Sequence, residues 1–267
     1  MQFTSIIMVQ KSSDEGLTWG EPEVLFPEEG TFSRQAIQIL SNGRWIFATW
    51  LCEDSAEGLT NDPTEFRVSD DQGQTWRRVR MPESNGRVHA NIVEVEEGHL
   101  VAFLRSRFAD NIYISESHDF GDSWTVPEKS VLPNNNASIS AIKLQTGEIA
   151  LAYNVNSASH PEFGKVSWPG LRNPVAVSVS EDFGQTWPIG RVLEQAEGYI
   201  SEENKTNNAQ YEYPTLYQTK DSLLHLVYAY HNRLCVKYVR CRVEDIFGEK
   251  REAEGVYNPT SGQGVEK

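Results

Sequence analysis

Short runs of alternating apolar and polar residues extend along most of the chain. The clearest runs occur in pairs, namely AIQIL (36–40) with RWIFATW (44–50), ANIVEV (90–95) with LVAFL (100–104), and LLHLVYAY (223–230) with LCVKYV (234–239). Alternation with a period of two is typical of β-strands, and Gly, Asn or Asp between two runs indicates a hairpin. No window of the sequence carries a competing amphipathic helical period. The pattern therefore predicts an all-β fold of antiparallel strands.

An eight-residue motif, Ser-x-Asp-x-Gly-x-Thr/Ser-Trp, interrupts this pattern four times. It stands at 12–19 (SSDEGLTW), 69–76 (SDDQGQTW), 117–124 (SHDFGDSW) and 180–187 (SEDFGQTW). Ser and Asp side chains can bind the amides of a turn, and Gly adopts a positive φ without strain. A terminal Trp can bury its large ring beneath such a turn. We therefore interpret the motif as one hairpin turn used four times.

The aspartates of this motif could instead be four catalytic or calcium-binding groups. Identical chemistry at four places in a repeat protein is more typical of scaffolding, so we predict structural roles and no metal site. The residues concerned are Asp14, Asp71, Asp119 and Asp182, together with Trp19, Trp76, Trp124 and Trp187.

The spacing of the motifs indicates the architecture. The leading serines stand at 12, 69, 117 and 180, so successive motifs are 57, 48 and 63 residues apart. These are blade-sized units with variable loops, somewhat longer than the ~40–45 residues of compact propeller blades. Four-stranded sheets packed radially bury faces that a single sheet would expose, which favours a β-propeller.

Each full unit is predicted to contain four strands. The predicted strands are 33–40, 44–51, 64–69 and 77–81, then 88–96, 99–105, 111–117 and 125–131, then 137–144, 148–154, 174–180 and 188–193. Two more strands flank the first motif (3–11 and 21–26), and three follow the last unit (211–219, 223–230 and 234–241). Residues 1–245 thus make about four to four and a half blades, and the polar residues 246–267 are predicted to be a disordered tail.

Composition narrows the range of functions. The 267 residues include seven Trp, eleven Phe and ten Tyr, enough to fill a core, and 38 acidic against 24 basic residues give a net charge of −14. That sign opposes binding to a phosphate backbone, and no phosphate-binding glycine motif is present, so we expect no nucleic-acid partner. We also predict no membrane span, no signal peptide on this chain and no disulfide between its three cysteines. The compartment stays open, and an extracellular location would require a signal peptide on a longer form.

The four motifs on short-strand sheets resemble the Asp-box, or BNR, repeats of the sialidase superfamily. Within it, HANIVEVEEGHLVAFLRSR, LPNNNASISAIKLQTGEIALAYN, LRNPVAVSVSEDFGQTWP and YEYPTLYQTKDSLLHLVYAY look most like the group of predicted neuraminidases. The resemblance covers the chain to about residue 245 and implies a six-bladed propeller. The predicted strands are seven short of that fold, which implies a propeller that lacks its N-terminal blades.

The resemblance also implies a set of site residues. Sialidases use a tyrosine nucleophile activated by a glutamate, with three arginines that clamp the substrate carboxylate and an aspartate as acid/base. The pattern of glycine, apolar run and arginine-serine assigns the second clamp arginine to Arg105, and the strand entering the fourth motif assigns the third to Arg172. The nucleophile corresponds to Tyr213, with Tyr211 as second choice.

The chain departs from the family at the activating glutamate. The expected position, sixteen residues before Arg105, holds His89, and Asn91 follows two residues on. His89 could serve as a base and Asn91 as a substrate contact. Glu212 is expected to point away from Tyr213, because side chains alternate along a strand.

The resemblance implies two further site groups, and a long loop offers other candidates. The first clamp arginine and the acid/base aspartate are expected in the absent N-terminal part. The loop at 155–171 offers His160 and Trp168 as a lid or as sugar-stacking groups.

The sequence is compatible with three functions. The first is a sialidase-like glycoside hydrolase acting on sialic acid or another acidic terminal sugar, without a cofactor, and inactive or weak as this chain. The second is a glycan-binding propeller without turnover, and the third is a purely structural propeller. A hydrolase or a glycan-binding propeller would be favoured if one central cavity contained Arg105, Arg172 and Tyr213. A carboxylate within hydrogen-bond distance of Tyr213 would favour the hydrolase over the binding protein. Open blade edges would allow self-association.

Overall fold

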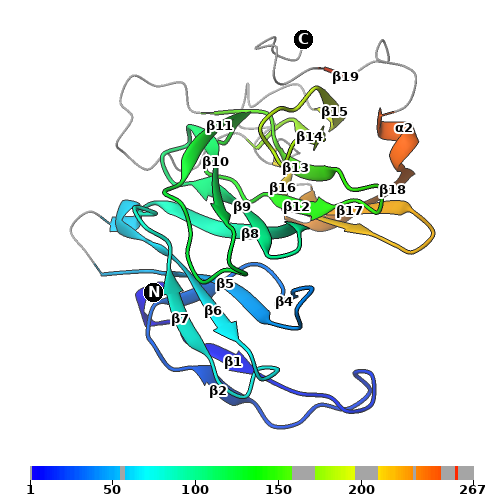
Figure 1. The fold of residues 1–267 in the computed structure, drawn as a ribbon. Helices are drawn as coiled ribbons and strands as arrows, with labels where there is room; N and C mark the ends of the chain where they lie inside the picture. The colour runs from blue at the N-terminus through cyan, green and yellow to red at the C-terminus, as the bar shows by residue number, and fades with distance from the viewer. Residues whose placement is uncertain are drawn as a thin grey trace.

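A computed structural model of the chain describes residues 2–54, 58–157, 172–195, 210–230, 233–247 and 256–257. Within these ranges the fold is all-β and forms four blades in an incomplete propeller arrangement, as the sequence pattern predicts (Figure 1). The described helical segments are short, namely η1 (Gln2–Thr4), η2 (Gly58–Asn61) and α2 (Val243–Phe247). None of the described helices has the length and hydropathy needed to cross a bilayer.

The described strands pair antiparallel in five sheets. The N-terminal sheet contains β1 (Ile7–Val9) and β2 (Glu23–Phe26). The second contains β3 (Thr31–Ser33), β4 (Gln38–Ile39), β5 (Trp45–Leu51), β6 (Thr64–Ser69) and β7 (Arg77–Arg80). The third contains β8 (Arg87–Glu96), β9 (His99–Ser106), β10 (Asn111–Ser117) and β11 (Glu128–Pro133).

Two further sheets complete the described fold. The fourth sheet contains β12 (Ser140–Lys143), β13 (Ile149–Asn154), β14 (Val175–Ser180), β15 (Ile189–Glu194) and β19 (Val256–Tyr257). The fifth contains β16 (Glu212–Gln218), β17 (Leu223–Tyr230) and β18 (Cys235–Arg242). In Figure 1 the sheets follow one another in chain order, from the blue N-terminal strands at the bottom to the orange C-terminal strands.

The structure departs from the predicted strands at several strand ends, and most of all in the first forty residues. The segment 33–40 is not one strand, because it divides into β3 and β4, which pair with different parts of β5. The first predicted strand, 3–11, shortens to β1 and is preceded by η1. In the predicted tail, Ile246 is 3% exposed within α2, and β19 pairs with β15, so ordered structure extends beyond residue 245.

Among the described residues, three large hydrophobic cores lie between consecutive blades, beside a smaller cluster around Trp50 and Val88. Inner strands contribute to two of the large cores at once. Leu100, Ala102 and Leu104 of β9 enter the first core, against the second sheet. Val101 and Phe103 of the same strand enter the second core, against the fourth sheet. Because side chains alternate across a strand, a blade buried on both faces reads as a continuous apolar run. Burial of each Val, Leu or Phe side chain among them contributes about 1.5–3 kcal/mol.

The four motifs form the same hairpin turn. In each, the Ser hydroxyl donates to the Asp carboxylate at 2.7–2.8 Å and accepts the Gly amide at 2.7–2.9 Å. The carboxylate also accepts the backbone amide and hydroxyl of the Thr or Ser four residues on. The Gly lies at φ of 84–95°. These hydrogen bonds all lie within the turn that carries the carboxylate, which supports the structural interpretation.

The tryptophans of the motifs differ in burial. Trp187 is fully buried and Trp124 is 7% exposed, whereas Trp19 is 62% exposed. The expectation that every motif buries its ring therefore fails at the first turn. Trp19 belongs to the turn between the two strands of the N-terminal sheet, and no described sheet covers it. Burial of the ring depends on the next blade, not on the motif.

Candidate active site

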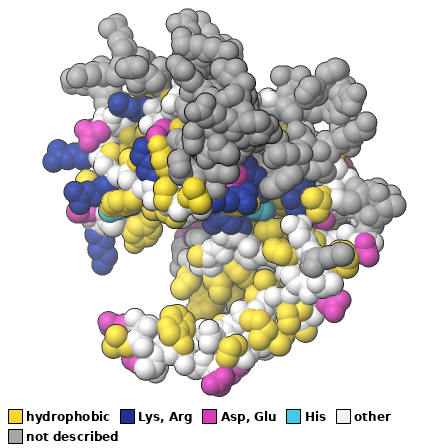
Figure 2. Space-filling model, turned by 180° about the vertical axis from the view of Figure 1, so that it is seen from behind, with side chains coloured by type: hydrophobic (Ala, Val, Ile, Leu, Met, Phe, Trp, Pro, Cys, Tyr) yellow, Lys and Arg dark blue, Asp and Glu magenta, His cyan; other side chains and the backbone are white. Residues whose placement is uncertain are grey.

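A cavity of about 510 Å³ opens where three sheets meet. It is lined by residues from the second, third and fifth sheets and their connections, namely Gln2, Phe32, Arg34, Trp50, Leu59, His89, Arg105, Arg107 and Tyr213. The register of the third sheet pairs Val88 with Arg105, so the start of β8 and the end of β9 meet here. Figure 2 shows a hollow with Lys or Arg side chains and a histidine gathered beside it.

Arginines surround the Tyr213 ring. The Cζ atoms of Arg172, Arg34 and Arg233 lie 5.3, 5.7 and 5.9 Å from the ring centroid. Arg105 and Arg172 are each 2% exposed, and both guanidinium groups are hydrogen-bonded to the Tyr213 side chain. The structure thus brings together Arg105, Arg172 and Tyr213, which are far apart in the sequence.

The charge around Tyr213 alters its acidity. Burial by itself would raise the pKa of the phenol, but the Arg172 and Arg105 guanidinium groups outweigh it and lower the pKa below its ordinary value. Burial lowers the pKa of Arg105, and the positive charges of Arg107 and Arg172 lower it further. An arginine stays protonated at neutral pH even so. The site is therefore a cationic, poorly hydrated pocket suited to an anion.

Tyr213 itself has an unusual backbone. Its φ is +53°, and the pairing of β16 with β17 is irregular between Glu212 and Thr215. A positive φ in a non-glycine residue is strained and often marks a functional position. The backbone carbonyl of Tyr213 accepts a hydrogen bond from Arg34 Nη2 at 3.3 Å, and the same nitrogen donates to Thr215 Oγ1 at 3.0 Å.

The position of Glu212 differs from the sequence-based expectation. Its Oε1 lies 3.3 Å from Arg172 Nη1, its Oε2 pairs with Arg233, and it is 5% exposed. Both arginines also lie over the Tyr213 ring, so Glu212 belongs to the same site. The positive φ of Tyr213 breaks the strand alternation on which the expectation rested. Among the described residues, no carboxylate is hydrogen-bonded to the Tyr213 hydroxyl.

His89, the residue expected at the position of the activating glutamate, lines the cavity. The ring stacks on Trp50 with centroids 4.3 Å apart, Nδ1 lies 3.3 Å from Ser138 Oγ, and Nε2 lies 3.4 Å from Arg105 Nη1. Burial, followed by the charges of Arg105 and Arg107, holds the pKa of His89 well below its ordinary value. The imidazole is therefore neutral at pH 7, and its Nε2 can accept a hydrogen bond from Arg105.

Asn91 and Tyr211 do not line the cavity. Asn91 Nδ2 donates to the His89 carbonyl at 2.9 Å, and its Oδ1 accepts the Ala141 amide at 3.2 Å, so it links β8 to β12. Tyr211 is 1% exposed in the third core. Its carbonyl accepts Asn154 Nδ2 at 3.0 Å, and its amide donates to the Arg172 carbonyl at 2.9 Å. His160 and Trp168 lie outside the described residues.

A turn of four polar residues supports Arg105. Asn136, at φ +57°, accepts a hydrogen bond from Arg105 Nε at 2.8 Å. Asn134 shapes the turn, because its Oδ1 accepts the amides of Ser106 and Asn136 and its Nδ2 donates to Ala137. The run NNNAS (134–138) was the available signal, since consecutive asparagines favour turns.

Other cavity residues were missed by sequence reasoning. Arg34, Phe32 and Trp50 precede the segments of resemblance and carry no motif. Arg107 follows Arg105 by two residues and lies 2.9 Å from Asp62 Oδ2. Asp62 is fully buried, and burial raises the pKa of its carboxyl against the opposing charge of Arg107. The sequence Arg-Ser-Arg at 105–107, at the end of a predicted strand, was the available signal.

Comparison with known proteins identifies the family of the chain. Residues 2–226 match the family described as BNR repeat-like domain, so the chain belongs to that family and to the sialidase superfamily. It is 26% identical over 206 residues to a sialidase of Bacteroides fragilis, covering 70% of this chain and 34% of that protein. It is 29% identical over 112 residues to sialidase B of Streptococcus pneumoniae, covering 39% of this chain and 15% of that protein. The chain thus spans about a third or less of these relatives.

Solved structures share the fold. A Hadza microbial sialidase superposes with a TM-score of 0.69 at 18% identity, over 90% of this chain and 44% of the other. The intramolecular trans-sialidase of Ruminococcus gnavus gives a TM-score of 0.68 at 19% identity, over 90% of this chain and 50% of the other. The predicted sialidase-type propeller, incomplete in this chain, is confirmed.

Proposed function

We propose that this chain supplies the arginine-lined part of a sialidase-like glycoside hydrolase site that takes sialic acid or another acidic terminal sugar. The observation that carries the proposal is the convergence of Arg105 and Arg172, both 2% exposed, on the Tyr213 side chain. Buried guanidinium groups offer planar, permanently charged donors that match a carboxylate. The sialidases to which the chain is similar support the same substrate class.

The cavity suits one terminal sugar. Its volume of about 510 Å³ lies within the usual range of small-molecule sites. Phe32 and Trp50 stack with centroids 5.5 Å apart and give the cavity an apolar part of its lining. Sugar C–H groups would pack on that apolar part while the carboxylate faces Arg105, Arg172 and Arg34.

In the proposed reaction the Tyr213 oxygen bonds to the anomeric carbon as the glycosidic C–O bond breaks, and the departing oxygen takes a proton from water. A second water molecule then breaks the bond between Tyr213 and the sugar, which releases the free sugar and returns a proton to solvent. The neighbouring guanidinium groups favour the phenolate form of Tyr213. Because His89 is buried and contacts Arg105, we assign it the positioning of Arg105. Asn91 and Tyr211 act through the backbones of His89 and Arg172.

Turnover by this chain is expected to be weak. Leaving-group protonation needs an acid, and none of the described residues that line the cavity carries a carboxyl group. Loss of a general acid typically costs about 10²–10⁴ in rate. The same observation favours the second candidate, a glycan-binding propeller without turnover.

The proposal is tested by comparing the binding of two ligands and by measuring the activity of one variant. Calorimetry with sialic acid and with its methyl ester compares a carboxylate with an uncharged copy, and the ester is expected to bind much more weakly. Equal binding of both would exclude a carboxylate clamp. A fluorogenic sialoside then separates the candidates, because Tyr213→Phe should retain sialic acid binding and abolish any residual turnover. Residual turnover that survives this change would exclude Tyr213 as nucleophile.

A further inference from the structure

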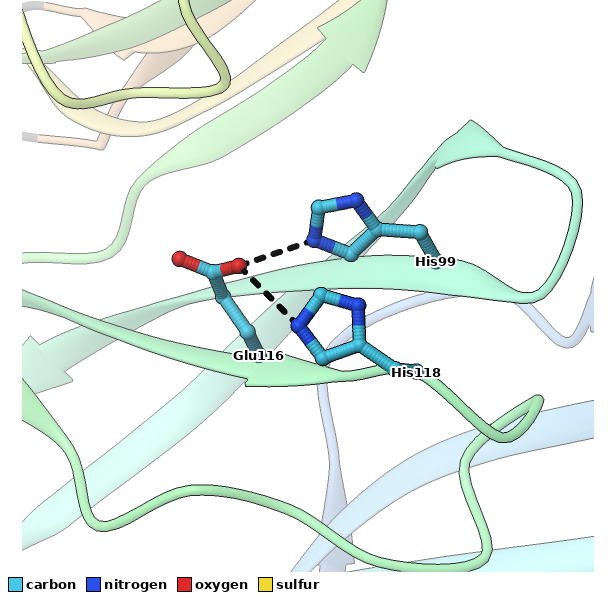
Figure 3. A group of neighbouring side chains, drawn as sticks. All are labelled: His99, Glu116 and His118. Atoms are coloured by element: carbon cyan, nitrogen blue, oxygen red, sulfur yellow. Dashed lines mark hydrogen bonds and ion pairs between the residues drawn. The ribbon is translucent and has the colours of Figure 1, made fainter.

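Two histidines and a glutamate meet on the third sheet, away from the cavity. His99 begins β9, Glu116 lies in β10, and His118 is the second residue of the third motif (Figure 3). The Nε2 atoms of His99 and His118 lie 2.8 and 3.6 Å from Glu116 Oε2. One nitrogen or oxygen atom from each residue lies within 4.8 Å of the other two.

We propose that this group is a zinc site of the His₂Glu type, with water as the fourth ligand. Zinc binds imidazole nitrogen and carboxylate oxygen at about 2.0–2.2 Å, and a tetrahedron of that size separates its ligands by about 3.4 Å. The distances of 2.8 and 3.6 Å to Glu116 Oε2 lie on either side of that value. Small side-chain rotations would therefore suffice to bind the ion.

The strand register holds the three ligands on one face. Glu116 pairs with Val101 and Ser117 with Leu100, which places His118 beside His99. Residues 99 and 101 share one face of β9, and Glu116 lies on the same face of β10, with His118 directly after the end of that strand. The rings of His99 and His118 stack with centroids 4.1 Å apart. The hydrogen bonds of Ser117 and Asp119 fix the turn that carries His118.

The fourth motif supplies outer support for the ligands. Gln185 Nε2 donates to Glu116 Oε1 at 3.4 Å, which leaves Oε2 for the ion. The Phe183 ring packs edge-on against His99, with centroids 5.5 Å apart. Such outer contacts orient metal ligands and tune affinity. An ion here would therefore stiffen the contact between the third and fourth blades.

The donor set selects the metal. Two imidazoles and one carboxylate suit Zn²⁺, whereas Mg²⁺ and Ca²⁺ require mostly oxygen ligands. The side chain of His118 is 67% exposed, so an ion can enter from solvent. His99 and Arg105 lie at opposite ends of β9, about 20 Å apart at the usual rise per residue. Zinc binding is thus independent of the proposed sugar site.

The test is titration of the tag-free, chelator-treated chain with ZnCl₂ in a calorimeter. We expect one ion per chain and a higher Tm with Zn²⁺ but not with Mg²⁺, because the ion binds the folded state. Since outer-shell changes alone cost about 10–100-fold in affinity, His118→Ala and Glu116→Gln should weaken binding about 100-fold or more. His225→Ala is the matched control, because His225 contacts Tyr238 and Thr219 on another sheet, and it should bind Zn²⁺ normally.

Circular dichroism of each variant verifies that the fold is retained, and the exposure of His118 makes His118→Ala the decisive variant. Absence of zinc binding by the intact chain would overturn the proposal. Equal affinity in His118→Ala and the intact chain would overturn it as well.

Discussion

Replacing Asp182 by alanine removes the acceptor of three hydrogen bonds in the fourth motif. Asp182 Oδ1 accepts from Ser180 Oγ and from the Thr186 amide, both at 2.7 Å, and Oδ2 accepts the Thr186 hydroxyl at 2.5 Å. Hydrogen bonds to a charged group contribute about 1.5–3 kcal/mol each, but those within one turn are not additive. We expect a loss of about 1–3 kcal/mol in the free energy of unfolding.

The position of this turn makes the loss measurable. Trp187 is fully buried, its Nε1 donates to the Gly184 carbonyl at 3.0 Å, and its ring packs edge-on against Phe103 of the third sheet. A loosened turn therefore disturbs the second core. For a domain of this size, 2 kcal/mol corresponds to a Tm lower by about 4–8 °C. Urea unfolding and calorimetry would measure both quantities.

Asp14→Ala is the matched control, because it makes the same bonds in a motif whose Trp19 is 62% exposed. It should lower the Tm less than Asp182→Ala. Sugar binding by the folded Asp182→Ala variant should be unchanged. A variant that keeps its Tm but loses sugar binding would refute the structural assignment of the motif.

Three further outcomes are expected. Arg172→Lys should weaken sialic acid binding about tenfold or more, because a point charge replaces the planar guanidinium. Arg80 is exposed, so Arg80→Lys should bind sialic acid as the intact chain does. Calorimetry would measure the affinity of both variants. Hydrogen bonds from Thr75 lower the pKa of Asp71 to about 2. The stability that the ionised Asp71 contributes is therefore complete above about pH 4 and is lost as the pH falls towards 2. Urea unfolding at a series of pH values should show that Asp71→Asn reduces the loss of stability between pH 4 and pH 2. Val236 is 71% exposed on β18, which is an edge strand of its sheet, and should promote self-association through that edge. Val236→Lys should therefore lower the mass measured by light scattering towards that of the monomer. An unchanged mass would exclude β18 as the contact between chains.

The strand content and the repeated turn are readable from the amino-acid sequence alone. Alternation predicts strands because the period of two is a local property of extended backbone. The motif predicts its own hydrogen bonds, since Ser180, Asp182 and Thr186 find their partners within seven residues. The division of 33–40 into β3 and β4 was not predictable, because it depends on how each half pairs with β5.

The full set of residues in the candidate site becomes visible only when the blades are packed together. Resemblance pointed to Arg105, Arg172 and Tyr213, but Arg34, Trp50 and Arg107 come from segments without a motif and meet them only when blades pack. The positive φ of Tyr213 placed Glu212 against Arg172, contrary to simple alternation. The zinc ligands likewise come together through the register of β9 and β10. Turns arise from contacts close in sequence, whereas a site joins distant strands, and its geometry is set by packing between sheets.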